Sequence, residues 1–324
     1  MMRIAKALRP RLRLPVVLLL WLCATAAGAQ QVVRIIVPFG AGGVQDILAR
    51  TIAPELGQII GKNVIVENRT GASGTIGNAL VAKSAADGNT LLLAAASHTI
   101  TGHVYTNLTY HPIADFTAVA HIGTVDYVLM VNAAVPAKTV AEFIAYAKAN
   151  PGKLNFASAG SGSATHLSMA YFANLTGIDM VHVPYKATNE AVNEVLAGRA
   201  DAVIASTIGA LGFTRDARVR MLGVTGATRS KFLPEMPTLA ESGVKGYAFD
   251  SWMGLLGPAG IPKGTVDALN GAVGQLLRNP AVLERLDKQG VVPRAMSPEE
   301  FSALLREDFA KMGRLVKAAG ARIE

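Results

Sequence analysis

One glycine-rich segment constrains the fold of this chain more than any other. Residues Pro38–Asp46 read Pro-Phe-Gly-Ala-Gly-Gly-Val-Gln-Asp and lie between an apolar run, Val32–Val37, and a helical pattern that begins at Ile47. A buried strand therefore runs into a helix through a turn with three glycines. Glycine lets the backbone approach a ligand closely, and a helix start offers unpaired N–H groups at the positive end of the helix dipole. The segment predicts a site that holds an anion, a phosphate or a carboxylate, without a charged side chain.

The first 29 residues have the pattern of an export signal that is removed from the mature protein. Five cations between residues 3 and 13 precede a short apolar core, Leu14–Leu22, and Ala27–Ala29 forms an A-x-A cleavage site. The core is too short to be expected as a stable membrane span. The single cysteine, Cys23, lies inside this segment, so we expect a mature chain that depends on its hydrophobic core and has no disulfide.

The charge of the chain does not favour a nucleic-acid partner. The formal net charge of +8 comes from 31 basic and 23 acidic residues, and five of the cations belong to the expected export signal. Removing those five leaves an excess of about three positive charges. The mature part has few aromatic residues and no runs of Lys or Arg, so it shows neither a stacking platform nor a phosphate track.

Strand and helix patterns alternate along the chain in two series, which predicts two α/β domains built on doubly wound, mostly parallel sheets. About 295 residues after the signal are enough for two hydrophobic cores. Tyr247–Leu256 is interpreted as the return from the second unit to the first. The predicted organisation is a signal peptide at 1–29, a first domain of 30–130 plus 250–324, and a second domain of 131–249.

Turns rich in glycine and serine follow strands in both units. Asn68–Gly74 follows a strand of the first unit, and Ser158–Ser163 follows a strand of the second. Ser97 with His98, and Ser206, occupy comparable positions after two further strands. Ligands bind at the carboxyl ends of the strands in open α/β sheets, so two such units that face each other predict a ligand cleft between the domains.

Six short motifs in this order resemble one known family over nearly the whole mature chain. They are Pro38-Phe39-x-Ala41-Gly42-Gly43-x-x-Asp46, Asn68-Arg69-x-Gly71-Ala72-x-Gly74, Ser158-x-Gly160-x-Gly162-Ser163-x-x-His166-Leu167, His182-Val183-Pro184-Tyr185-Lys186, Gly198-Arg199-Ala200-Asp201 and Pro237–Val244. The chain resembles the Bug receptors, the solute-binding subunits of tripartite tricarboxylate transporters.

The resemblance implies a function as well as a fold. It implies a two-domain periplasmic "Venus flytrap" that binds a small carboxylate, such as a dicarboxylate, an amino acid or an aromatic acid, without catalysis or cofactor. The implied partner is a membrane permease, and we expect a monomer. An orphan receptor that feeds a sensor kinase remains an alternative, because nothing in the chain separates signalling from transport.

The resemblance also implies which residues bind the ligand. In that family, backbone amides of two facing loops and ordered water hold the ligand carboxylate. This chain departs from the pattern at Gln45, where the family often has Thr or Ser, and at Ala187, where it often has Gly. Gln45 carries both donors and an acceptor and is expected to reach the distal end of the ligand. The full set of candidate ligand-binding residues is Phe39, Ala41, Gly42, Gly43, Gln45, Asp46, Ser97, His98, Ser161, Gly162, Ser163, Thr165, His166, Tyr185 and Ser206.

Several of these residues also have an ordinary structural interpretation. Asp46 is the expected N-cap of the first helix, and one of Ser161, Ser163 and Thr165 should cap the helix that contains Leu167. We expect His166 to be a packed, hydrogen-bonded histidine rather than an acid or base.

Enzyme motifs are absent from the sequence. There is no G-x-S-x-G elbow, no H-E-x-x-H and no Walker sequence. The best catalytic alternative is an exported serine hydrolase that uses Ser161 or Ser163 with His166. These residues are too close on one helix start to make a relayed triad easily.

Overall fold

The strand that the first apolar run predicted forms as β1 (Val32–Val37) and pairs in parallel with β2 (Asn63–Asn68) and β3 (Thr90–Ala95). The computed structural model describes residues 32–319, so the expected export signal at 1–29 lies outside the described residues. These strands belong to a six-stranded sheet with the order β11-β4-β10-β3-β1-β2. Its other members are β4 (Phe116–Val125), β10 (Ser251–Pro258) and β11 (Val291–Pro293).

Helices cover both faces of this first sheet, because successive residues of its central strands point to opposite faces and are apolar on both. Ile35 packs in a cluster with α2 (Val44–Ile60), α9 (Lys263–Leu276) and α10 (Pro280–Lys288). Its neighbour Ile36 packs on the other face, with α3 (Thr75–Ala82) and the first turns of α11 (Pro298–Ala319). A buried core on each face therefore fixes the sheet.

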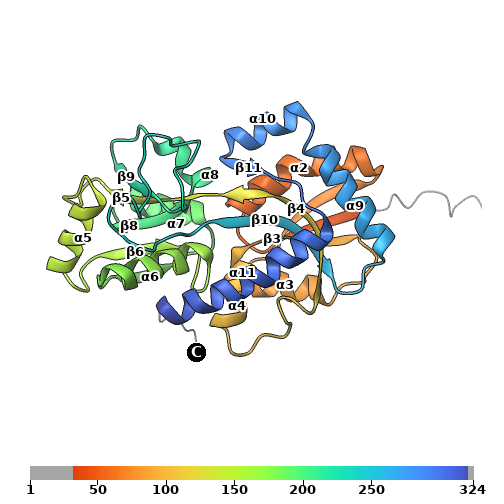
Figure 1. Cartoon of the computed structure of the whole chain (residues 1–324), viewed down its shortest axis with the longest axis horizontal. Helices are drawn as coiled ribbons and strands as arrows, with labels where there is room; N and C mark the ends of the chain where they lie inside the picture. The colour runs from red at the N-terminus through yellow and green to blue at the C-terminus, as the bar shows by residue number, and fades with distance from the viewer. Residues whose placement is uncertain (1–31, 320–324) are drawn as a thin grey trace, which may run out of the picture.

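A second sheet of five strands, in the order β7-β6-β8-β5-β9, forms the other unit. One of its faces is covered by α5 (Val140–Ala149) and α6 (Ala164–Thr176), and the other by α7 (Thr188–Leu196). The two units lie side by side along the long axis of the molecule (Figure 1). The strands are β5 (Tyr127–Asn132), β6 (Asn155–Ser158), β7 (Val181–Pro184), β8 (Ala202–Ser206) and β9 (Val219–Val224).

Both sheets are mixed, which corrects the expectation of mostly parallel sheets. Four strand pairs are parallel and five are antiparallel. The parallel strands, β1 to β3 and β6 to β8, are those that the alternating pattern identified. β5 and β10 lie inside their sheets and begin where the chain crosses from the other unit, and each runs antiparallel to both of its neighbours.

The chain crosses between the units where these two strands begin. β4 leads through Asp126 directly into β5, and β10 begins at Ser251 after the second unit is complete. Thr225 links the two segments that cross between the units. Its Oγ1 donates to the carbonyl oxygen of Phe249 at 2.7 Å, and its N–H donates to the carbonyl oxygen of Tyr127 at 2.9 Å. Because β5 pairs wholly in the second sheet, we propose a first domain boundary at Asp126 rather than at residue 130.

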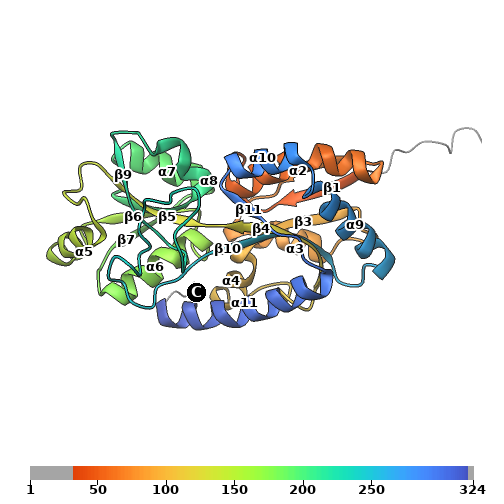
Figure 2. The ribbon, with the colours of Figure 1, turned by 45° about the horizontal axis from the view of Figure 1, so that its top comes forward.

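Helix α11 is shared by the two units. Its first turns pack on the first sheet, whereas Met312 and Val316 belong to the core of the second unit. Figure 2 shows α11 running beneath both units, past α4 (Ala96–Val104) and α6. No helix within residues 32–319 is long and apolar enough to cross a membrane.

Candidate ligand-binding site

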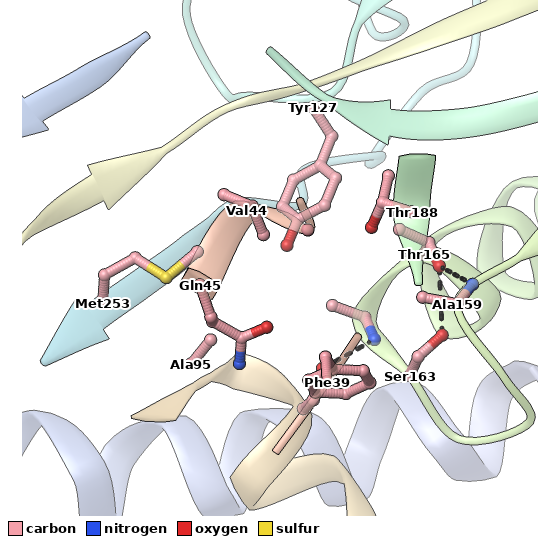
Figure 3. Close-up of a pocket in the computed structure, with 13 residues that line it drawn as sticks. Phe39, Val44, Gln45, Ala95, Tyr127, Ala159, Ser163, Thr165, Thr188 and Met253 are labelled. Atoms are coloured by element: carbon pink, nitrogen blue, oxygen red, sulfur yellow. Dashed lines mark hydrogen bonds between the residues drawn. The ribbon is translucent and has the colours of Figure 1, made fainter. Parts of the chain in front are cut away.

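Four helices begin at one cavity between the two units. They are α2 and α4 of the first unit and α6 and α7 of the second. The residues around the cavity surround about 350 Å³ of space that no atom fills, part of which is open to solvent, and Figure 3 shows these residues. They are Phe39, Gly43, Val44, Gln45, Ala95, Ser97, Tyr127, Ala159, Ser163, Ala164, Thr165, Thr188 and Met253.

The turn before α2 places the start of that helix at the cavity. Gly43 is the N-cap of α2, and Gly42 has a φ of +75°, a conformation that glycine adopts without strain. Asp46 was expected to be the N-cap, and this prediction was wrong because the helix begins at Val44, a turn before Ile47. Its carboxylate instead reaches back and accepts the N–H of Gly42 at 2.9 Å.

Asp46 is turned away from the cavity and is already paired. Its carboxylate accepts hydrogen bonds from Arg50 Nε and Asn68 Nδ2, both at 3.0 Å. Burial alone would raise the pKa of Asp46, but the hydrogen bonds from Arg50, Gly42 and Asn68 lower it below its ordinary value. Asp46 therefore fixes the glycine turn as a buried carboxylate.

The turn before α6 forms the facing wall. Ser163 is the N-cap of α6 and accepts the N–H of His166 at 3.2 Å, so the prediction that one hydroxyl of this turn caps the helix is confirmed. Thr165 Oγ1 accepts the N–H of Ala159 at 2.9 Å and lies 3.0 Å from Ser163 Oγ. These bonds hold the turn in one shape with two hydroxyl groups at the cavity.

The two facing walls contact each other directly. Ser97 Oγ, at the start of α4, accepts the N–H of Ala164 at 3.1 Å. The carbonyl oxygen of Ser161 accepts the hydroxyl of Tyr105 at 3.2 Å and that of Ser73, both from the first unit. The lobes are therefore held against each other around the cavity.

The histidines of the candidate set lie behind the cavity rather than in its wall. His166 Nδ1 accepts the N–H of Gly162 at 3.1 Å, and its ring stacks on His182 with 4.1 Å between the centroids. Burial, with a smaller contribution from His182, lowers the pKa of His166 to about 3, and burial lowers the pKa of His182 to about 4. His98 lies 2.7 Å from the carbonyl oxygen of Pro112, and burial lowers its pKa to about 4. All three are packed neutral rings.

The structure brings six of the fifteen candidate residues to this cavity: Phe39, Gly43, Gln45, Ser97, Ser163 and Thr165. Ser161 and Tyr185 line a neighbouring hollow, which also touches Phe39 and contains Lys186. Ser206 caps the short helix α8 (Thr207–Ala210) and is fully buried. The others, Ala41, Gly42, Asp46, Gly162, His98 and His166, do not line the cavity.

Sequence reasoning missed Tyr127, Thr188 and Met253, which also line the cavity. Thr188 had a usable signal, because it opens the helix that follows the Pro184-Tyr185-Lys186 turn. Tyr127 and Met253 lie on the two crossing strands, and only the folding of those strands between the lobes brings them to the site. Burial raises the pKa of Tyr127 to about 12, so its phenol is neutral.

None of the residues that line the cavity carries a charged side chain. The polar groups available are hydroxyls, the amide of Gln45 and main-chain N–H groups in the first turns of the four helices, apart from those of Ala164 and Ala96, which donate to Ser97 Oγ and Ser251 Oγ. Such groups can hold an anion, but they offer neither an acid nor a base of ordinary strength.

Two further observations bear on chemistry at this site. Within residues 32–319, no group of three or more His, Cys, Asp or Glu side chains is placed to hold a metal ion. The ring of His166 accepts from the main chain and makes no hydrogen bond to the hydroxyl of Ser161 or Ser163 in the described part of the chain. The pairing of His166 with Ser161 or Ser163 on which the hydrolase alternative depends is therefore not formed within the described residues.

The architecture and the site together define a two-lobed solute-binding protein of the periplasmic type. Residues 48–321 match the family model described as the tripartite tricarboxylate transporter family receptor. The chain belongs to this family, whose receptors act in the periplasm.

Individual relatives agree with this assignment. The chain is 32% identical to protein BugT of Bordetella pertussis over 294 residues, which cover 90% of each chain. Among solved structures, it is similar to R. palustris Rpa4515 with adipate, at a TM-score of 0.87 and 33% identity, over 91% of this chain and 100% of that one. It is also similar to MatC from Rhodopseudomonas palustris with bound malate, at a TM-score of 0.83 and 29% identity. This match covers 89% of this chain and 100% of that one. The resemblance to Bug receptors and the predicted α/β fold of the periplasmic binding proteins are thereby confirmed, with mixed instead of mostly parallel sheets.

Proposed function

We propose that this protein captures a small carboxylate between its two lobes and delivers it, chemically unchanged, to a tripartite tricarboxylate-type membrane permease. The observation that carries the proposal is the convergence of four helix starts, two from each lobe, on one uncharged cavity. The adipate and malate in the two similar solved structures support a carboxylate as the class of ligand.

The main-chain groups at the cavity suit one negative charge. The N–H groups of Val44 and Thr188 lie in the first turns of α2 and α7, where no intrahelical partner exists. A charge at a helix N-terminus gains about 0.3–1 kcal/mol from the dipole, and up to about 2 kcal/mol when partly buried. Hydrogen bonds to a charged group add about 1.5–3 kcal/mol each. A few such groups suffice for micromolar binding, and the absence of a lining carboxylate disfavours cations.

The cellular setting of the proposal comes from residues outside the described part of the chain. We propose that the export signal is cleaved near Ala29 and that the mature chain acts in the periplasm as a monomer. We also propose that it acts as a receptor and not as an enzyme.

Ligand-dependent melting tests the proposal. The purified exported form is mixed with a panel of mono- and dicarboxylates, and its melting temperature is compared with that of the free protein. A ligand at 100 times its Kd stabilises the folded state by about 2.7 kcal/mol, which for a chain of this size corresponds to a rise of about 5 °C or more. A panel that produces no shift with any acid would contradict the proposal.

A matched pair of variants locates the binding. Thr188→Val removes a buried hydroxyl at the cavity and should weaken binding of whichever acid stabilises the wild type by about tenfold. Thr176→Val removes a hydroxyl at the far end of α6, where it bonds to the carbonyl oxygen of Phe172, and should leave the affinity unchanged. Equal affinities in both variants would place the ligand elsewhere.

Uptake measurements separate transport from signalling. Loss of the chain from its host should abolish uptake of the bound acid if it feeds a permease. Unchanged uptake, together with a lost transcriptional response to the acid, would instead support the receptor of a sensor kinase.

A further inference from the structure

The two ends of the cavity differ in chemistry. Figure 3 shows Ser163, Thr165 and Thr188 together at one side, and Gln45, Ala95 and Met253 at the other. The first side offers three hydroxyls beside the starts of α6 and α7. The second side consists of apolar surface with one amide. A ligand that fills the cavity therefore meets a strongly polar environment at one end and a weakly polar one at the other.

The amide of Gln45 lies at the wall of the cavity. The residue is only 5% exposed, but its amide atoms are not among the fully buried polar atoms that lack a partner within residues 32–319, so solvent in the cavity reaches them. A ligand group that displaces this water must replace its hydrogen bonds. Figure 3 shows the side chain directed into the cavity, beside Ala95. Because it offers both a carbonyl oxygen and an N–H₂ group, it matches a neutral group that can donate as well as accept.

The starts of α2 and α4 lie at this end, but no cationic side chain stands there to balance a second carboxylate. Arg50, one turn along α2 from Asp46, is bonded to Asp46 and Asn68 and its side chain is 53% exposed. Lys186 lines the neighbouring hollow and not this cavity. The first N–H of α4, that of Ala96, is already donated to Ser251 Oγ at 3.1 Å. A second carboxylate here would be buried against Met253 and Ala95 with no cationic side chain beside it and with only the first turn of α2 to face it, which is unfavourable.

We infer that the ligand is a monocarboxylate with a neutral hydrogen-bonding group at its far end, and that Gln45 is the residue that selects it. The inference rests on the proposed receptor function and adds the class of carboxylate. The carboxylate lies at the hydroxyl-rich end and the neutral group, such as a carboxamide, pairs with the amide of Gln45. A diacid of the same length is discriminated against because its second charge meets no cationic side chain at this end.

Isosteric ligand pairs test the inference. Succinate is compared with succinamic acid, and adipate with adipic acid monoamide, by isothermal titration calorimetry at pH 7. Each pair differs at one end only, by a carboxylate in place of a carboxamide. We expect the monoamide to bind at least tenfold more tightly than the diacid in the pair whose length fits. The inference would be overturned if, in every pair that binds, the affinity for the diacid equals or exceeds the affinity for the monoamide. The receptor function would remain intact in that case. Failure of every carboxylate to bind would instead count against the receptor function itself.

Substitutions at Gln45 test the assignment of the residue. Gln45→Lys places a cation at the far end and should reverse the preference, so that the diacid binds more tightly than the monoamide. Gln58→Lys, on the exposed face of the same helix, adds the same charge away from the cavity and should keep the wild-type preference. Gln45→Met, which is uncharged and of similar length, should bring the two ligands of a pair closer in affinity. If both Gln45 variants still prefer the monoamide to the diacid as the wild type does, Gln45 does not select the ligand.

Discussion

Gly42 shows how a single residue can serve the backbone and the contact between the lobes at once. Its φ of +75° is a conformation that other residues adopt only with strain. A Cβ atom added here would lie 3.2 Å from Asn189 Nδ2 on α7, in the facing lobe. The residue therefore permits the turn before α2 and the close approach of the second lobe.

A glycine-to-alanine pair separates these two effects. Gly42→Ala should lower the free energy of unfolding by about 1 kcal/mol or more because of its positive φ, and it should also weaken carboxylate binding several-fold by pushing against Asn189. Gly61→Ala incurs a similar backbone cost at a φ of +65°, but nothing lies within 4 Å of its added Cβ. Chemical denaturation and calorimetry on both variants make the comparison. A loss of affinity of the same size in Gly61→Ala would show that strain alone, and not the contact with Asn189, is responsible.

At the scale of elements, the paired rings of His166 on α6 and His182 on β7 fix the turn that faces the cavity. Ser158, at the end of β6, lies with its Oγ 2.6 Å from His182 Nε2. His166 in turn accepts the N–H of Gly162. Both rings have pKa values far below the ordinary 6.5 because they are buried, so they are neutral in the folded state. The turn is therefore supported by neutral imidazoles.

This burial predicts a loss of stability in mild acid. Between pH 6.5 and about 4 the unfolded chain binds protons at these positions and the folded chain does not, so stability falls as the pH falls. Each such histidine contributes up to about 1.4 kcal/mol per pH unit in this window. His166→Asn keeps an acceptor for the N–H of Gly162 but does not titrate, and it should reduce the slope of unfolding free energy against pH.

The measurement is denaturant unfolding at pH 7, 6 and 5. His111→Asn replaces an exposed histidine whose Nδ1 also accepts main-chain N–H groups, and it controls for the substitution itself. A His166→Asn protein with the wild-type slope would contradict the assignment of a neutral buried imidazole at this position.

The elements also show what the sequence could predict. The strand at Val32–Val37 was located with its observed bounds, because an apolar run that ends at a glycine-rich turn defines such a segment. The start of α2 was placed three residues late, since Asp46 is a good N-cap type and Gly43 is a weaker one. The turns that build the cavity were found because glycine and serine mark strand-to-helix turns.

The parts of the site that remained hidden depend on long-range geometry. Tyr127 and Met253 are separated by 126 residues and reach the cavity because both crossing strands pass between the lobes. The stacking of His166 on His182 likewise needs α6 to fold back over the edge of β6 and β7. No local pattern encodes these contacts, whereas the family resemblance had already indicated that two loops face each other.

At the scale of the whole molecule, contacts between the lobes contribute to the apparent affinity for any ligand enclosed between them. The hydroxyls of Ser73 and Tyr105 both donate to the carbonyl oxygen of Ser161 across the interface. Ser73 and Tyr105 line the neighbouring hollow and not the proposed ligand cavity. Interactions present only when the lobes are together shift the population toward the enclosed form, and a ligand that binds that form gains affinity by the same factor.

Removing these two hydroxyls should therefore weaken binding without touching the ligand. We expect Ser73→Ala and Tyr105→Phe each to reduce carboxylate affinity about fivefold, since a hydrogen bond contributes about 1 kcal/mol. The double variant should lose more than the sum, because the carbonyl oxygen of Ser161 is then left without either donor. The loss of affinity should lie mainly in faster dissociation, which stopped-flow measurement resolves.

Ser84→Ala is the control for this prediction. It removes a comparable hydroxyl, bonded to the carbonyl oxygen of Leu80 within the first lobe, and should leave the affinity unchanged. If the double variant binds as tightly as the wild type, contacts between the lobes do not set the affinity, and the helix starts and hydroxyls of the cavity would account for it alone.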